Sequence, residues 1–302
     1  MELRHLQYFV SVAATGGFGR AARALHVSQS AISEQVRDLE QEIGVELFDR
    51  SQRQIRLTAE GELFLEGAKA TLATADQAVQ TVQRAKNGEE GKLTIGFFVG
   101  GNGRYFPRLI RAFRRQFPRI KLSLVEMVPS QQWVALANGT LDIGFTRPNL
   151  GSSSEGVRTE RFYTERLYAV LPSDHRLSRR KELSLRELEE ERFVMSERAT
   201  SPAVFDRILT LCGEAGFAPN IVSTATVSSG VIALVEAGDG IAIVPEGSRF
   251  LGPGDVHFVP LQGAATTVDL VIAWPSLRIS GAHRSFLTLA RKFRADNIVN
   301  SA

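Results

Sequence analysis

The sequence has only one cysteine, Cys212, among its 302 residues. A single cysteine excludes an intramolecular disulfide, a redox-active cysteine pair and a zinc site built from cysteines. Cys212 lies in DRILTLCGEAGF, a segment with the apolar spacing of an amphipathic helix. This position predicts a buried, unreactive thiol, and a thiol that senses oxidants is the alternative.

Catalytic and metal-binding motifs are also missing. The five histidines are scattered, and the sequence has no HExxH pair, GxSxG turn, Walker phosphate loop or GxGxxG motif. No nucleophile is paired with a base, and no set of residues has the spacing of metal ligands. The sequence therefore predicts a protein that is not an enzyme and uses no metal or cofactor.

Long apolar runs are absent as well. No segment approaches the roughly 20 apolar residues of a membrane-spanning helix. The apolar residues near the N-terminus are interrupted by Arg4, His5 and Gln7, which favours an amphipathic helix over an export signal. We therefore expect a cytoplasmic protein with no membrane partner. Its 302 residues suit two or three domains.

An excess of charge of one sign is nearly absent, because the formal net charge is only +3. Residues 1–58 carry as many acidic residues as arginines. Net charge therefore does not locate a nucleic-acid surface, and DNA binding has to be inferred from the local arrangement of side chains.

Apolar residues recur at helical spacing three times in residues 1–58. Leu3 to Ala13 predict a first helix that ends at Gly16, and Phe18–Leu25 predicts a second. Ser28 is well placed to cap the N-terminus of a third helix. The buried face of this third helix would consist of Ile32, Val36, Leu39 and Ile43.

The opposite face of the third helix carries short polar and charged side chains near its N-terminal end. They are Gln29, Ser30, Ser33, Glu34 and Arg37. A recognition helix contacts base edges with its N-terminal residues, and glutamine and serine side chains can bond to bases there. We therefore predict that this face binds double-stranded DNA, and a solvated helix face is the alternative.

Two short runs with alternating apolar residues follow, at Leu47–Arg50 and Gln54–Leu57. They predict a β-hairpin wing with Arg50 and Arg53 at its tip. Arginines at this place suit contacts to phosphates or to a narrow minor groove.

These segments resemble the LysR-type transcriptional regulators, and come nearest to the members that sense muconate-like and aromatic acids. The matching motifs are the Ala21-Ala22 pair, VSQSAIS, RDLE, LFDR and LTAEG. The resemblance implies a winged helix-turn-helix over residues 1–58, with a recognition helix that begins near Ser28 and DNA contacts from Arg50 and Arg53.

This sequence departs from the family's pattern at three positions. Gly17 and Gly19 stand where hydroxyl residues are usual, which weakens the cap of the second helix. Glu34 stands where many members have a basic or amide side chain. Glutamate can accept a hydrogen bond from cytosine but is repelled by phosphates, so Glu34 is expected to narrow the choice of DNA site.

Residues 59–87 predict a long helix, with Thr58 as its N-cap. Its apolar residues recur at three and four positions, as in a coiled-coil seam. The seam consists of Leu65, Ala68, Leu72, Ala75, Val79 and Val82. Pairing with a second copy is the favoured interpretation, and packing on the chain's own domains is the alternative. The resemblance implies homodimers that assemble into homotetramers.

Strand-like and helix-like runs alternate after Gly88, which predicts an α/β region over residues 88–302 with largely parallel sheets. The expected strands are Leu93–Phe98, Leu122–Met127, Leu141–Phe145, Leu167–Leu171, Ile241–Val244 and Val268–Ala273. The resemblance implies two lobes similar to periplasmic binding proteins, with an effector between them. The first lobe would comprise 92–162 and 268–302, and the second 163–267.

Candidate effector contacts lie where the expected strands end. Gly100, Gly101 and Asn102 precede a helix and could bind an anion through their amides, or could simply form a tight turn. Arg147 could bind a carboxylate, or could form a surface ion pair. Relatives that sense acids often have hydroxyl residues where this chain has Gly100 and Pro129, so Ser130 and Asn102 are the nearest substitutes.

The second lobe is expected to contribute Pro202, Phe205, Val227 and Ser228. The complete prediction is a multidomain protein, with an all-α-dominated winged helix-turn-helix and an α/β two-lobed effector domain. It would regulate transcription in response to a small acidic or aromatic effector, and would contact RNA polymerase if it is an activator. The alternatives are an enzyme or transport protein with an appended DNA-binding domain, and a nonspecific DNA-coating protein.

Overall fold

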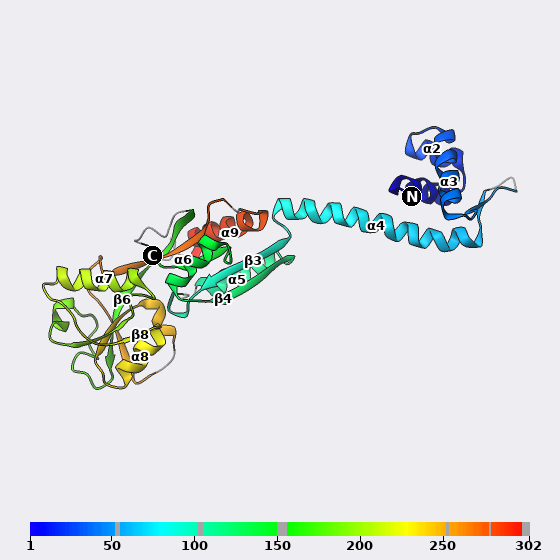
Figure 1. The fold of residues 1–302 in the computed structure, drawn as a ribbon. Coiled ribbons are helices and arrows are strands. Elements are labelled where there is room, and N and C mark those ends of the chain that lie inside the picture. Colours follow the sequence, from blue (N-terminus) through cyan, green and yellow to red (C-terminus); the bar gives the residue numbers. More distant parts are fainter. Residues whose placement is uncertain (52–54, 102–104, 150–155, 252–253, 278, 298–302) are drawn as a thin grey trace. The chain divides into compact units, whose positions relative to one another are not determined.

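The computed structural model describes residues 1–51, 55–101, 105–149, 156–251, 254–277 and 279–297. The chain divides into two compact units, Met1–Gln83 and Arg84–Ala302 (Figure 1). Among the described residues, no helix combines the length and apolar character needed to cross a membrane.

The first unit is a small helical domain with a two-stranded hairpin. Its elements are α1 (Leu3–Thr15), α2 (Phe18–Leu25), α3 (Gln29–Ile43), β1 (Phe48–Asp49), β2 (Arg56–Leu57) and most of α4 (Ala59–Asn87). Phe9 lies at the centre of the core, with its ring centroid 5.2 Å from that of Phe48 and 5.3 Å from that of Phe64. The three helices and the hairpin predicted for residues 1–58 are therefore confirmed.

Local capping chemistry explains where these helices begin and end. The Ser28 hydroxyl accepts a hydrogen bond from the Ala31 amide at 3.2 Å, as predicted for the N-cap of α3. The Thr58 hydroxyl accepts from the Gly61 amide at 2.9 Å at the start of α4. Helix α1 ends at Gly16 in the left-handed conformation with φ 68°, which glycine adopts at little cost.

The second unit contains a nine-stranded sheet among its described residues, in the order β4-β3-β5-β11-β6-β9-β7-β8, with β10 paired to β6. The strands are β3 (Gly91–Phe97), β4 (Ile120–Glu126), β5 (Ile143–Thr146), β6 (Val157–Pro172), β7 (Arg192–Ser196), β8 (Asn220–Ala225), β9 (Ile241–Pro245), β10 (Val256–Pro260) and β11 (Thr267–Pro275). The helices and 3-10 turns are α5 (Tyr105–Gln116), α6 (Pro129–Asn138), α7 (Pro202–Glu214), α8 (Ser228–Glu236), α9 (Gly281–Asn297), η1 (Val99–Gly101), η3 (Leu185–Leu188) and η4 (Glu246–Phe250).

The sheet is mixed, so the prediction of largely parallel sheets is only partly right. Strand β3 is parallel to β4 and β5, and β7 is parallel to β8 and β9. Strand β11 is antiparallel to both β5 and β6, and β6 is antiparallel to β9 and β10. The two long strands β6 and β11 therefore run in opposite directions between two parallel halves.

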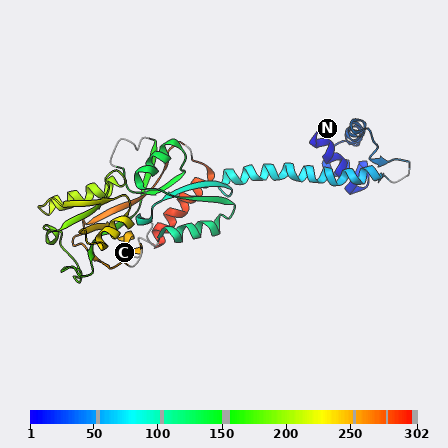
Figure 2. The same cartoon turned by 60° about the horizontal axis from the view of Figure 1, so that its bottom comes forward.

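Each half of the sheet has its own apolar core. The first core includes Phe113 and Phe286, whose ring centroids lie 5.0 Å apart. These rings pack α5 against α9, and the two helices lie side by side (Figure 2). The second core forms around β7, β9 and α7 and includes Phe193 and Cys212. The long strand β6 contributes Phe162 to the first core and Leu167 to the second.

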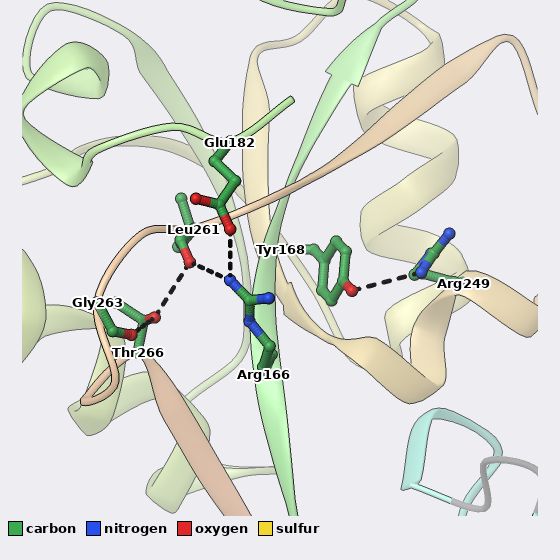
Figure 3. A network of polar contacts seen from close by, with 7 residues as sticks. All are labelled: Arg166, Tyr168, Glu182, Arg249, Leu261, Gly263 and Thr266. Atoms are coloured by element: carbon green, nitrogen blue, oxygen red, sulfur yellow. Dashed lines mark hydrogen bonds and ion pairs between the residues drawn. The ribbon is translucent and has the colours of Figure 1, made fainter. Parts of the chain in front are cut away.

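Hydrogen bonds join β6 to the segment that precedes β11, in the region between the two cores (Figure 3). Arg166 donates to the Glu182 carboxylate at 3.0 Å and to the Leu261 carbonyl at 3.1 Å. The Thr266 hydroxyl donates to the Gly263 carbonyl at 2.6 Å, and the Leu167 amide donates to the Thr266 carbonyl at 2.9 Å. These bonds fix the turn that leads into β11 against β6.

Candidate DNA-binding surface and effector cavity

The predicted DNA-reading residues share one face of α3. Gln29, Ser30, Glu34 and Arg37 are exposed and Ser33 is half-buried. The other face of the helix is committed to the core of the first unit through Ile32, Val36 and Leu39. The N-terminal half of α3 therefore presents amide, hydroxyl and charged groups to solvent, as a recognition helix requires.

Two glycines of α2 affect this surface. Gly17 caps α2 without any side-chain hydrogen bond, in agreement with the weakened cap predicted from the sequence. A Cβ atom at Gly19 would lie 3.2 Å from the Gln29 amide oxygen, which is closer than ordinary van der Waals contact. Gly19 therefore leaves room for the Gln29 side chain beside α2.

Arg50 lies at the start of the loop between the two strands of the wing, and its side chain is held by Glu40 of α3. Arg50 directly follows β1, and its Nη2 lies 2.5 Å from the Glu40 carboxylate. Its guanidinium also lies 5.5 Å from the centroid of the Phe18 ring. Arg53, the other arginine predicted for the wing, lies outside the described residues.

Glu40 is the residue that sequence reasoning missed at the wing. It is only 8% exposed, and its Oε1 accepts hydrogen bonds from the amides of Leu47 and Phe48 at 2.8 and 3.1 Å. Its Oε2 binds Arg50. An acidic residue that follows Leu39 in a helical pattern gives no sequence signal for burial, so this anchor of the hairpin to α3 was not predictable.

Residues of the predicted dimerisation seam have two different surroundings. Leu65, Ala68 and Leu72 pack against the core of the first unit, so their side chains are engaged within the chain itself. Val79 and Val82, in contrast, are 57% and 70% exposed. Ala75 is half-buried. The seam predicted from the sequence therefore combines an intramolecular contact with an open apolar surface.

The second unit contains a cavity of about 450 Å³ that is lined by residues from both halves of the sheet. Its apolar lining consists mainly of Phe98, Val99, Met127, Val128, Pro129, Val204, Val227, Ile243, Val244, Pro245 and Leu251. Its polar lining consists of Glu126, Gln131, Arg147, Ser196, Thr200, Ser201, Thr226, Ser228 and Ser229, and Gly100 completes it. This size and mixed lining are typical of small-molecule sites.

The structure places the predicted effector residues in different surroundings. Gly100, Arg147, Val227 and Ser228 line the cavity. Phe205 instead packs against the second core, because it faces inward from α7.

Within the described part of the chain, Pro202 and Ser130 are not among the residues that line the cavity. Pro202 starts α7, and Ser130 belongs to the first turn of α6, where its amide donates to the Thr200 carbonyl at 3.2 Å. Gly101 is the last residue of η1. Asn102 lies outside the described residues.

Arg147 forms neither the free carboxylate-binding site nor the surface ion pair that its sequence position suggested. Its side chain is 1% exposed and forms an ion pair with Glu165 of β6, which is 3% exposed. Its Nη1 donates to the Asp269 carbonyl at 3.1 Å, and the Phe98 ring centroid lies 5.3 Å from the guanidinium. Burial raises the pKa of Glu165, while Arg147 and the Gly247 amide oppose that rise.

Gly100 lies where η1 approaches α8 and η4 closely. A Cβ atom at position 100 would lie 2.6 Å from the Ser228 hydroxyl, and one at Gly247 would lie 2.7 Å from the Gly100 carbonyl oxygen. Of the two roles considered for this glycine, a closely packed turn is therefore the one that the geometry supports.

Cys212 is fully buried in the second core. Burial raises the pKa of its thiol to about 11, so the reactive thiolate is scarce at neutral pH. The predicted burial of the thiol is confirmed.

Family models match nearly the whole chain. Residues 3–62 match the bacterial regulatory helix-turn-helix protein model of the lysR family, and residues 86–295 match the LysR substrate binding domain. The chain belongs to the LysR family. It is thus a DNA-binding transcription regulator with an effector-binding domain, and not an enzyme, as its sequence predicted.

Several LysR regulators resemble this chain over most of its length. The transcriptional regulator AlsR of Bacillus subtilis is 35% identical over 91% of this chain and 90% of its own. The hca operon transcriptional activator HcaR of Escherichia coli is 34% identical over 97% and 98%. The crystal structure of full-length CbnR complexed with target DNA has a TM-score of 0.82 at 29% identity, covering 97% of this chain and all of CbnR.

Proposed function

We propose that this LysR regulator recognises a specific DNA sequence through the N-terminal half of α3 and changes its DNA binding when a small molecule occupies the cavity. The observation that carries the proposal is the exposed polar face of α3 in a chain whose structural relative CbnR was crystallised on its target DNA. Regulation of transcription takes place at the chromosome, so we propose the cytoplasm as the location.

The roles proposed for the α3 residues follow from their chemistry. Gln29 can bond adenine through its amide, and Ser30 and Ser33 can donate to or accept from several bases. Arg37, one turn further along, is suited to a phosphate. Glu34 can accept a hydrogen bond from cytosine, and its negative charge would disfavour positions close to phosphates.

We further propose that the protein acts as a homodimer that assembles into a homotetramer. Val79 and Val82 expose apolar surface on α4, and a second copy of the helix would cover it. Two copies would present two recognition helices to two half-sites of a DNA duplex. If the protein is an activator, RNA polymerase would be a further partner.

For the effector, the sequence left an acidic or an aromatic molecule as alternatives. The cavity of about 450 Å³ is three times the size of engineered cavities of roughly 150 Å³ that bind benzene, so it can hold a substituted ring. Its largely apolar lining favours the aromatic alternative.

Selection of bound duplexes from a random DNA library, at near-physiological salt, tests the proposed DNA recognition. The expected result is a motif with dyad symmetry. Gln29→Ala and Ser33→Ala should change the preferred bases, whereas Arg53→Ala should weaken binding more evenly across sequences. Gln41→Ala, at an exposed position near the other end of α3, serves as the matched control and should keep the wild-type preference.

Recovery of no motif, together with binding that depends only on salt concentration, would contradict sequence-specific recognition. Identical base preferences for Gln29→Ala, Ser33→Ala and Arg53→Ala would contradict the roles assigned to these residues.

A further inference from the structure

We infer that the cavity is built for an uncharged, largely apolar molecule with a hydroxyl or carbonyl group, and not for a carboxylate. The inference rests on the proposed function, in which this cavity is the effector site. Three observations support it: the charges of the residues that line the cavity, the first residues of the helices around it, and the largely apolar side chains of its walls.

The single cationic side chain in the described lining is already neutralised within the protein. Arg147 is paired with the buried Glu165 carboxylate, and its Nη1 donates to the Asp269 carbonyl at 3.1 Å. The second oxygen of Glu165 accepts a hydrogen bond from the Gly247 amide at 2.9 Å, which holds the carboxylate in place. The positive charge of Arg147 is therefore already compensated by Glu165 and is not available to an anionic ligand.

A ligand carboxylate placed at Arg147 would have to compete with Glu165. It would lose its hydration in a largely apolar cavity and lie near a second buried negative charge, both of which are unfavourable. Glu126, also in the lining, adds a further acidic side chain. Within the described part of the chain, the Nε of Arg147 has no hydrogen-bond partner. This N–H is buried, so it adds no donor that an anion in the cavity could reach.

Two of the helices that begin at the cavity have proline as their first residue, which removes one amide from each. Helix α6 begins with Pro129 and α7 with Pro202, and proline has no N–H group. The next amide of α6, that of Ser130, donates to the Thr200 carbonyl. Helix α8 begins with Ser228 and Ser229, whose amides have no acceptor within the helix. These two amides are enough to bind one oxygen of a ligand, but they are too few for a ligand that carries two carboxylates.

The remaining walls match a ring with a polar substituent. Phe98, Met127, Val204 and Ile243 are among the many apolar side chains in the lining. Hydroxyl groups form most of the polar lining, and those of serine can both donate and accept. The hydroxyl of Thr200 lies 2.9 and 3.0 Å from the Glu197 and Thr226 carbonyls, so its single hydrogen is already donated within the protein.

Calorimetric titration of the full-length protein with benzamide and with benzoate tests the inference, because the two compounds have nearly the same shape and differ in charge. Wild-type protein should bind benzamide at least about tenfold more tightly. In Glu165→Gln, Arg147 loses its counter-charge, so the preference should shift toward benzoate. Glu160→Gln, on the same strand but paired with Arg291 at the surface, is the matched control and should keep the wild-type preference.

A wild-type preference for benzoate would overturn the inference and would leave the cavity in place as the effector site. This comparison does not depend on the folding of any variant. An unchanged preference in folded Glu165→Gln would also overturn it, because Glu165 would then not control the charge at Arg147. Binding of neither compound to any of the three proteins would contradict the proposed effector site itself.

Discussion

Glu40 and Glu165 are both nearly buried acids, and each holds an arginine that the sequence had suggested for contact with a ligand or with DNA. In both pairs the carboxylate also accepts backbone amide hydrogen bonds, from Leu47 and Phe48 in one case and Gly247 in the other. A buried carboxylate with several donors fixes local geometry, because removing it leaves those donors without an acceptor. At the scale of single residues, these acids therefore position the wing and shape the cavity.

Glu40→Gln should destabilise the first unit by about 2 kcal/mol, because Arg50 and two backbone amides lose a charged acceptor. DNA affinity should fall for all sequences alike, since the wing is no longer fixed to α3. Urea unfolding and DNA titration measure the two effects. Glu46→Gln, at an exposed position of the same segment, is the matched control. Wild-type stability in Glu40→Gln would refute the anchoring role.

Gly100→Ala should lower the thermal stability of the second unit and weaken binding in the cavity, because the new Cβ would lie 2.6 Å from the Ser228 hydroxyl. Overpacking of this kind typically costs about 1–3 kcal/mol. Adding Ser228→Gly removes the clashing hydroxyl, so the double variant should recover much of the lost stability. Calorimetric unfolding of the single and double variants measures this coupling. Strictly additive effects would show that the close contact does not limit residue 100.

At the scale of elements, periodicity predicted the helices well and the strands unevenly. Helices α1 to α4 have regular apolar spacing and capping residues such as Ser28 and Thr58, and both kinds of signal are local. Strands β7, β8 and β10 were missed. Most residues of β8 are exposed or half-buried, so it lacks the apolar run of a central strand. The first half of β6 was missed because charged residues interrupt it.

The sequence also did not predict which residues pair with buried polar groups. The lining residues Gly100, Arg147, Val227 and Ser228 were predictable, because they follow or cap recognisable elements. Glu165 was not, because Arg147 follows β5 and Glu165 lies on β6, and β11 lies between these two strands in the sheet. The sequence also could not show that one part of α4 is buried and another exposed, because this depends on tertiary packing. Ala68 and Val82 belong to the same periodic pattern, but Ala68 lies in the core of the first unit and Val82 is exposed.

The two exposed valines of α4 lead to a test of self-association. Val79→Glu with Val82→Glu should shift the protein toward the monomer, because two charges would have to be buried in the helix pairing that we propose. Both side chains are more than half exposed, so the fold of the single chain should be retained. Sedimentation velocity measures the shift, and Gln77→Glu at an exposed position of the same helix is the control. An unchanged mass distribution would refute this surface as the dimer contact.

At the scale of the whole molecule, we propose that occupation of the cavity in the second unit changes DNA binding by the first. A ligand can shift the protein between states only if it binds them with different affinity. Ligand binding in the cavity should therefore change the affinity for DNA or the stretch of DNA that the protein protects from cleavage. This change should disappear when a bulky side chain blocks the cavity.

The most direct measurement is DNA protection on a duplex selected by the protein, with and without benzamide. Wild-type protein should show an altered affinity or protected region with the ligand. Val204→Trp, which fills the cavity from α7, should show no ligand effect, and Val134→Trp, at an exposed position of α6, should respond like wild type. Identical protection with and without a ligand that calorimetry shows to be bound, or an equal response in Val204→Trp, would contradict control of DNA binding by the cavity.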